Sequence, residues 1–148
     1  MFRGRYEHTI DQKGRTSIPS RFRELLSTKY ADDRLIITSF LDPCLIAYPV
    51  AEWQAFEERV RALPRFDPKV VRLKRVFISG ASECPIDRNG RILIPPVLRD
   101  FAGLKREIVW SGMVDYIEIW AKDGWDLRDR QDRDQISDLG GALEDLML

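Results

Sequence analysis

The feature of this sequence that most constrains its fold is an internal repeat. Residues 10–19 align with residues 86–95 at an offset of 76, and both segments follow the pattern I-D-x-x-G-R-x-x-I-P. The alignment continues through Arg23-Glu24 and Arg99-Asp100. The aromatic residues that close the two copies also match, Tyr48 with Trp120 and Trp53 with Trp125, at an offset of 72. A repeat of this kind predicts two copies of one structural unit.

Each copy is expected to contain a hairpin followed by a short helix. Lys13-Gly14 and Asn89-Gly90 predict tight turns, because Asn-Gly is typical of hairpin turns whose central residues take positive φ. The prolines at residue 19 and residues 95–96 suit the first turn of a helix. Gly103 is a candidate C-cap for the second of these helices.

The remainder of each copy is expected to form two strands, and two helices are expected between the copies. β-Branched and aromatic residues predict strands over residues 35–38, 45–48, 108–111 and 116–120. Helical spacing of apolar residues predicts a helix over residues 52–63 and another that begins at Asp67-Pro68 and continues through Phe77. The residues after Trp125 are polar and acidic, which predicts a loosely held tail or a short terminal helix.

These elements predict an α+β fold that is mainly β. A unit of four strands and one short helix is small for an independent core. We therefore expect the two copies to intertwine and share one barrel, as a symmetric dimer would. Residues 1–50 and 81–125 are expected to form the two units, residues 51–80 the connecting helices, and residues 126–148 the acidic tail.

Composition indicates a soluble globular protein. Of the 148 residues, 44% are hydrophobic and 32% are charged. No apolar run approaches the roughly 20 residues needed to span a bilayer. The first residues lack the apolar segment of a signal peptide, so we expect a cytoplasmic protein without membrane contact.

Charge is balanced overall but not along the chain. The sequence has 24 basic and 24 acidic residues, yet residues 1–30 carry a net charge of +4 and residues 121–148 carry −4. The neutral total argues against indiscriminate binding of polyanions, although it permits one basic face.

Common enzymatic and metal-binding patterns are absent. Cys44 and Cys84 lie far apart without a CxxC pattern, and His8 is the only histidine. The sequence therefore predicts no catalytic residues, no metal site and no cofactor. A small hydrolase with paired carboxylates at Asp32-Asp33 or Glu57-Glu58 is the enzymatic alternative, but neighbouring residues diverge on a strand or a helix.

The D-x-x-G-R hairpin followed by I-P and a short helix resembles the SpoVT/AbrB-type DNA-binding unit. Two copies, together with the opening Met1-Phe2-Arg3-Gly4 and the segments 79–84 and 116–120, resemble the MraZ family of bacterial transcriptional regulators. The resemblance covers residues 1–125 and makes the two units SpoVT/AbrB-like.

The resemblance implies a swapped-hairpin β-barrel built by both halves and a ring-shaped homo-oligomer. It implies binding to direct repeats in double-stranded promoter DNA, regulation of the division and cell-wall gene cluster, and association with the nucleoid. The functional residues of the family fall here on Asp11 and Arg15 and on Asp87 and Arg91.

The chemistry of these residues suits DNA recognition. Arginine pairs bidentately with guanine, and a two-stranded ribbon can enter the major groove. We expect five basic residues to bind DNA: Arg3, Lys13, Arg15, Arg88 and Arg91. We expect five others to form the turns or orient the arginines: Asp11, Gly14, Asp87, Asn89 and Gly90. The aromatic residues at the ends of the repeats are expected to belong to the core and not to stack on bases.

Two alternatives remain open at this point. The hairpins could be well-formed turns that merely carry an exposed arginine. The chain could also be an AbrB-like antitoxin or protein-interaction module, whose acidic tail covers a toxin.

Overall fold

The structure is a computed structural model, which describes residues 1–147. Eight strands are present: β1 (Arg5–Thr9), β2 (Arg15–Ser17), β3 (Arg34–Ser39), β4 (Leu45–Tyr48), β5 (Ser82–Pro85), β6 (Arg91–Leu93), β7 (Glu107–Met113) and β8 (Tyr116–Ala121). Six α-helices accompany them: α1 (Ser20–Thr28), α2 (Val50–Arg61), α3 (Pro68–Leu73), α4 (Pro96–Ala102), α5 (Lys122–Asp134) and α6 (Gly140–Met147). A π-helical turn, η1 (Lys74–Ile78), and a 3₁₀ turn, η2 (Ile136–Leu139), complete the chain. The α+β class predicted from the sequence is confirmed.

Six strands form one antiparallel sheet in the order β1-β7-β8-β4-β3-β5, and β2 and β6 form a separate two-stranded sheet. The pairing crosses between the repeats. Strand β1 of the first repeat pairs with β7 of the second, and β5 of the second repeat pairs with β3 of the first. Each repeat thus supplies one edge strand to the hairpin of the other.

The expected closed barrel is not found among the described residues. The six-stranded sheet is open, with β1 and β5 at its edges. Within the described residues, β2 and β6 form a separate ladder of three residue pairs, and one isolated bridge joins Thr16 of β2 to Ile10, so this ladder does not join the two edges. The two repeats are therefore interlocked by exchanged strands, while the sheet itself stays open.

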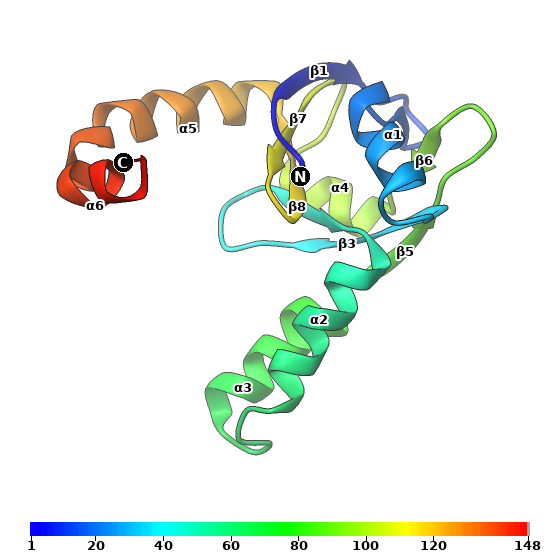
Figure 1. The fold of residues 1–148 in the computed structure, drawn as a ribbon. Coiled ribbons are helices and arrows are strands. Elements are labelled where there is room, and N and C mark those ends of the chain that lie inside the picture. Colours follow the sequence, from blue (N-terminus) through cyan, green and yellow to red (C-terminus); the bar gives the residue numbers. More distant parts are fainter. Residues whose placement is uncertain (148) are drawn as a thin grey trace.

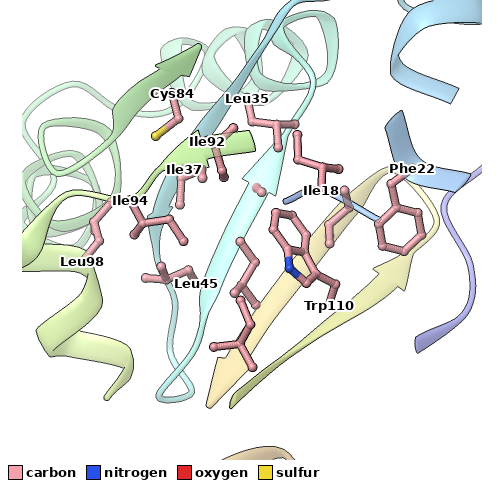
Figure 2. Close-up of a cluster of buried hydrophobic side chains, with 14 of the residues drawn as sticks. Ile18, Phe22, Leu35, Ile37, Leu45, Cys84, Ile92, Ile94, Leu98 and Trp110 are labelled. Carbon is pink, nitrogen blue, oxygen red and sulfur yellow. The ribbon is translucent and has the colours of Figure 1, made fainter. Parts of the chain in front are cut away.

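The core lies where the sheet meets the residues that follow the two short strands. Ile18 and Ile94, which come directly after β2 and β6, are almost fully buried. They pack with Phe22, Ile37 and Trp110 in one cluster of buried side chains. Figure 2 shows that this cluster draws on both repeats. The repeated I-P pair therefore places one isoleucine of each copy in a shared core.

The predicted helices and strands are largely confirmed. All four strands expected after the hairpins fall within β3, β4, β7 and β8. Asp67 caps α3 by accepting a hydrogen bond from the backbone N–H of Lys69, and Pro68 occupies the first turn. Gly103 ends α4 in a left-handed conformation with φ of 64°.

The second connecting helix differs from its prediction. The apolar stripe from Val70 to Phe77 predicted one helix, but α3 ends at Leu73 and continues as the π-helical turn η1. Helices α2 and α3 project from the sheet as an arm (Figure 1).

The C-terminal region is more ordered than the tail expected from residue 126 onward. Helix α5 runs from Lys122 through that position to Asp134. It is held by charge pairs, including Lys122 with Glu7 and Arg128 with Asp42. The sequence lacks an apolar stripe here, so periodicity gave no indication of a long helix. The region ends in the short helix α6, which is one of the two possibilities that the sequence predicted.

Among the described residues, no helix is both long enough and apolar enough to cross a lipid bilayer.

Candidate nucleic-acid interface

The first turn is organised by Asp11. Its Oδ1 atom accepts hydrogen bonds from the backbone N–H groups of Lys13 and Arg15, both at 2.9 Å. Its Oδ2 atom accepts a hydrogen bond from Nε of Arg15 at 2.9 Å. The backbone N–H of Gly14 donates to the carbonyl oxygen of Asp11, which closes a four-residue turn. One carboxylate thus fixes both the turn and the side chain of Arg15.

The second turn repeats this arrangement. Oδ1 of Asp87 accepts hydrogen bonds from the backbone N–H groups of Asn89 and Arg91, at 2.8 and 3.0 Å. Nε of Arg91 donates to Oδ2 of Asp87 at 3.3 Å, and the N–H of Gly90 donates to the carbonyl of Asp87. The longer arginine–carboxylate distance makes Arg91 the less firmly held of the two arginines.

The expected turn conformation is wrong in one respect. The only positive φ values in the two turns belong to Gly14, at +93°, and Gly90, at +74°. Asn89 therefore does not adopt the positive φ of a type I′ turn. Aspartate at the first position and glycine at the fourth are typical of a type I turn, and the left-handed glycine then adds the bulge of a three-residue hairpin loop. The aspartate side chain, by binding two amides, favours this geometry over the one that Asn-Gly suggested.

Strands β2 and β6 bring the two arginines together. Arg15 pairs with Leu93, and Ser17 pairs with Arg91, in an antiparallel register. Side chains alternate along a strand, so Arg15 and Arg91 share the exposed face of this ribbon, whereas Thr16 and Ile92 are buried beneath it. From strand spacing and rise, the two arginine Cα atoms lie about 8 Å apart.

Both arginines retain free hydrogen-bonding groups. Their side chains are 44% and 41% exposed. Each is held through Nε alone, and within residues 1–147 the terminal nitrogens of Arg15 and Arg91 have no hydrogen-bond partner. These terminal groups belong to the fork of donors that matches O6 and N7 of guanine.

The other predicted DNA-binding residues are placed less uniformly. Lys13 and Arg88 are exposed in the two turns, but Lys13 is the third residue of its turn and Arg88 the second. Arg3 lies apart from the turns, because it precedes β1 and borders a hollow with Arg21 and Glu24 beside α1. The structure therefore brings four of the five predicted basic residues onto the ribbon and its turns.

Two arginines that the sequence analysis assigned no role contact the turns. Arg99 of α4 donates a hydrogen bond to the carbonyl oxygen of Gln12, and Arg23 of α1 donates to the carbonyl oxygen of Asn89, each at 3.3 Å. Arg23 and Arg99 occupy equivalent positions in the internal repeat, and this equivalence could have indicated from the sequence that they share a role.

Of the four aromatic residues at the ends of the repeats, Trp53 and Trp120 are buried, whereas Tyr48 and Trp125 are half-buried and pack against them. Trp53 and Trp120 are only 6% and 2% exposed. Tyr48 packs against the ring of Trp53, and Trp125 packs edge-on against Trp120. Nε1 of Trp120 donates to Glu118, whose pKa is raised by burial. The rings of Trp53 and Trp120 are therefore not available as a platform for bases.

Two of the residues considered for enzyme chemistry, Asp32 and His8, make hydrogen bonds within the fold. Oδ2 of Asp32 accepts a hydrogen bond from the backbone N–H of Val50 at the start of α2. Nδ1 of His8 lies 2.9 Å from the hydroxyl of Ser17, and partial burial lowers the pKa of His8. Burial raises the pKa of Cys84 to about 11 and also raises that of Cys44. Among residues 1–147, no group of histidine, cysteine and acidic side chains is arranged to hold a metal ion.

We expect both turn aspartates to titrate below the ordinary range. The backbone N–H of Arg15 is the largest cause of the lowered pKa of Asp11, and that of Arg91 plays the same role for Asp87. A lowered pKa in the folded state stabilises the fold above the unfolded pKa, and this contribution is lost as pH falls through the folded pKa. Carboxyl carbon NMR during an acid titration measures both values.

The substitution Arg15→Lys separates the backbone from the side chain in this titration. It keeps the backbone N–H and a positive charge, so we expect Asp11 to retain most of its lowered pKa. An ordinary pKa for Asp11 in either protein would contradict the turn geometry.

Comparison with known proteins agrees with this two-part organisation. The family described as "MraZ protein, putative antitoxin-like" matches residues 1–76 and again residues 77–137. A transcriptional regulator MraZ from Desulfitobacterium hafniense (strain DSM 10664 / DCB-2) is 43% identical over 146 residues, which covers 99% of each chain. This chain belongs to the MraZ family.

Other MraZ relatives match over a similar extent. The transcriptional regulator MraZ of Moorella thermoacetica is 43% identical over 98% of both chains. That of Pelotomaculum thermopropionicum is 43% identical over 100% of this chain and 99% of its own. The solution structure of PHS018 from Pyrococcus horikoshii covers 80% of this chain and 88% of its own, but its TM-score of 0.34 and 15% identity support no structural argument.

Proposed function

We propose that this MraZ-family chain is a sequence-specific, DNA-binding transcriptional regulator. The observation that carries the proposal is the ribbon of β2 and β6, which places Arg15 and Arg91 on one exposed face with their terminal nitrogens free. A separation of about 8 Å lets both arginines enter one major groove, which is roughly 12 Å wide. The names of the relatives support the same function.

The ribbon arginines and the basic residues of the turns make different contacts with DNA in this proposal. Arg15 and Arg91 read base edges, and Lys13 and Arg88 contact phosphate or base. The two turns have different sequences and place their basic residue at different positions, so the two halves read unequal base sequences. Arg3 contacts DNA only where the duplex extends beyond the ribbon.

Assembly supplies the affinity that one copy lacks. The chain has no net charge and offers four basic side chains on the ribbon and its turns, so a single copy binds one short site weakly. A ring-shaped homo-oligomer presents the same surface repeatedly, and linked contacts become effectively intramolecular. Such an array suits direct repeats in a promoter better than an inverted palindrome. We propose that these repeats lie upstream of the chain's own operon, in the division and cell-wall gene cluster, and that the protein works in the cytoplasm on the nucleoid.

Selection from a random DNA library tests this function without assuming an operator. The full chain is incubated with the library at two salt concentrations, and bound DNA is amplified and sequenced. We expect tandem copies of a short, guanine-containing motif in one orientation and at a fixed spacing. Failure to enrich any motif would contradict sequence-specific binding, and inverted copies would contradict the direct-repeat arrangement.

The antitoxin-like description of the family supports a second candidate function. Helix α6 carries exposed apolar side chains at Leu143, Leu146 and Met147, beside an acidic segment. A stoichiometric small basic protein that co-purifies with the chain from its native host would favour this alternative.

A further inference from the structure

We propose that Arg23 and Arg99 are positioning residues, each of which fixes the DNA-contacting turn of the opposite repeat. The inference rests on the proposed DNA-binding function, but its structural part can be tested without DNA. Arg99 belongs to the second repeat and reaches the turn of the first, whereas Arg23 belongs to the first and reaches the turn of the second. Neither arginine lies on the exposed face that is proposed to read bases.

Arg99 joins its own repeat to the first turn. Its Nε atom donates to the carbonyl oxygen of Ile94 at 2.9 Å, and its Nη1 atom donates to the carbonyl oxygen of Gln12 at 3.3 Å. The backbone N–H of Ile94 in turn donates to the carbonyl of Gly14 at 2.8 Å. The guanidinium group is therefore part of a closed set of hydrogen bonds around the turn.

The space that Arg99 occupies exists because residue 14 is glycine. A Cβ atom built on Gly14 would lie 2.6 Å from Nε of Arg99 and 2.6 Å from the carbonyl oxygen of Ile94. The left-handed backbone at this position independently favours glycine. Gly14 thus permits both the turn and the close approach of the arginine.

Arg23 makes the equivalent but weaker contact with the second turn. Its Nη1 atom donates to the carbonyl of Asn89 at 3.3 Å, and a Cβ atom on Gly90 would overlap its guanidinium group. Arg23 is exposed and makes one hydrogen bond, whereas Arg99 is half-buried and makes two. The contact also falls on a different residue, because Gln12 is second in its turn and Asn89 is third.

A chain of contacts connects Arg99 to the base-reading arginine. Arg99 holds the backbone of the turn at Gln12, and the turn presents its amides to Asp11. Asp11 in turn holds the guanidinium of Arg15. Loss of Arg99 would therefore loosen Arg15 without removing any group that touches DNA, and Arg23 would act on Arg91 in the same way.

Hydrogen exchange in the free protein tests the reciprocal contacts. We compare exchange of the N–H groups of Gly14 and Ile94, which report on the first turn, with those of Gly90 and Ile18, which report on the second. Arg99→Ala should accelerate exchange about fivefold in the first set, as loss of its hydrogen bond to the turn at Gln12 would do, and leave the second set unchanged. Arg23→Ala should show the reverse pattern with a smaller effect.

DNA affinity in paired substitutions tests the link to Arg15. We expect Arg99→Ala to weaken binding of the selected DNA about fivefold. In a protein that already carries Arg91→Ala, it should weaken binding by the same factor. In a protein that already carries Arg15→Ala, it should cause no further loss of affinity. Arg99→Lys keeps the charge but cannot bridge two carbonyls in a fixed plane, so it should restore affinity only in part. Arg21→Ala is the control, because it removes an exposed positive charge from α1, the equivalent helix of the first repeat, and within residues 1–147 Arg21 makes no hydrogen bond to a turn.

The outcomes separate this inference from the proposed function. Equal loss of affinity from Arg99→Ala in the Arg15→Ala and Arg91→Ala backgrounds would overturn the positioning role and make Arg99 a direct DNA contact. Unchanged hydrogen exchange at Gly14 and Ile94 would overturn the contact itself. If Arg99→Ala alters exchange at Gly14 and Ile94 but the wild-type protein binds no specific DNA, the proposed function is refuted and the structural contact stands.

Discussion

The substitution Arg15→Ala should weaken binding to the selected DNA by about 5- to 150-fold, which is the range for loss of one bidentate arginine–guanine contact. Arg91→Ala should cause a smaller loss, because Nε of Arg91 lies 3.3 Å from its carboxylate partner and that of Arg15 lies 2.9 Å from its own. Better preorganisation of a side chain leaves less entropy to lose on binding. Fluorescence anisotropy with specific and scrambled duplexes measures both effects.

The double substitution should remove the preference for specific DNA without abolishing binding. Lys13 and Arg88 remain exposed in the two turns and still contact phosphates, so affinity for scrambled DNA should fall much less. Arg65→Ala is the matched control for each single substitution, because it removes one exposed positive charge from the loop between α2 and α3 (Figure 1). Equal losses on specific and scrambled DNA would show that the two arginines contribute only charge.

The largest loss of stability is expected for Trp110→Ala. Trp110 lies in the middle of β7, is fully buried, and pairs with Tyr6 of β1 on one side and Ile119 of β8 on the other. Replacing a buried tryptophan by alanine costs about 3–5 kcal/mol. This is a large part of the 5–15 kcal/mol that typically separates folded from unfolded states. Urea denaturation followed by far-ultraviolet circular dichroism measures the change.

Two further variants separate packing from hydrogen bonding at this site. The indole N–H of Trp110 has no hydrogen-bond partner within residues 1–147. Trp110→Phe keeps one six-membered aromatic ring and removes that unpaired donor, so it should cost clearly less than Trp110→Ala. Trp125→Ala removes a half-buried tryptophan from α5 and should also cost less. A loss for Trp125→Ala as large as that for Trp110→Ala would contradict the placement of the core.

Much of the fold could be predicted because the repeat constrained it. The aspartate–glycine–arginine pattern, the I-P pair and the runs of β-branched and aromatic residues each indicate local structure. Because the two copies match, each of these assignments was supported twice. The exchange of β1 and β5 between the repeats depends on long-range pairing, which local patterns do not encode. Helix α5 was missed because charge pairs with Glu7 and Asp42 hold it, and such pairs leave no apolar period.

The residues of the candidate site could be predicted from the sequence, but the contacts that hold its turns in place could not. The turn aspartates and arginines follow from sequence spacing, and the structure brings them together on one ribbon. The contacts of Arg23 and Arg99 cross between repeats and join residues 66 and 87 positions apart, so only a folded chain shows them. The predicted conformation of Asn89 was wrong, because hydrogen bonds from two backbone amides to Asp87 outweigh the local preference of Asn-Gly.

The exchanged edge strands have a consequence for how this chain can change over generations. Strand β1 pairs with the hairpin of the second repeat, and β5 pairs with that of the first. A destabilising substitution in the edge strand of one repeat therefore also destabilises the other repeat. After duplication of an ancestral unit, selection for stability would therefore act on the two interlocked repeats together. The outward residues Gln12-Lys13 and Arg88-Asn89 are free of that constraint, and there the copies can drift apart and acquire separate recognition of DNA.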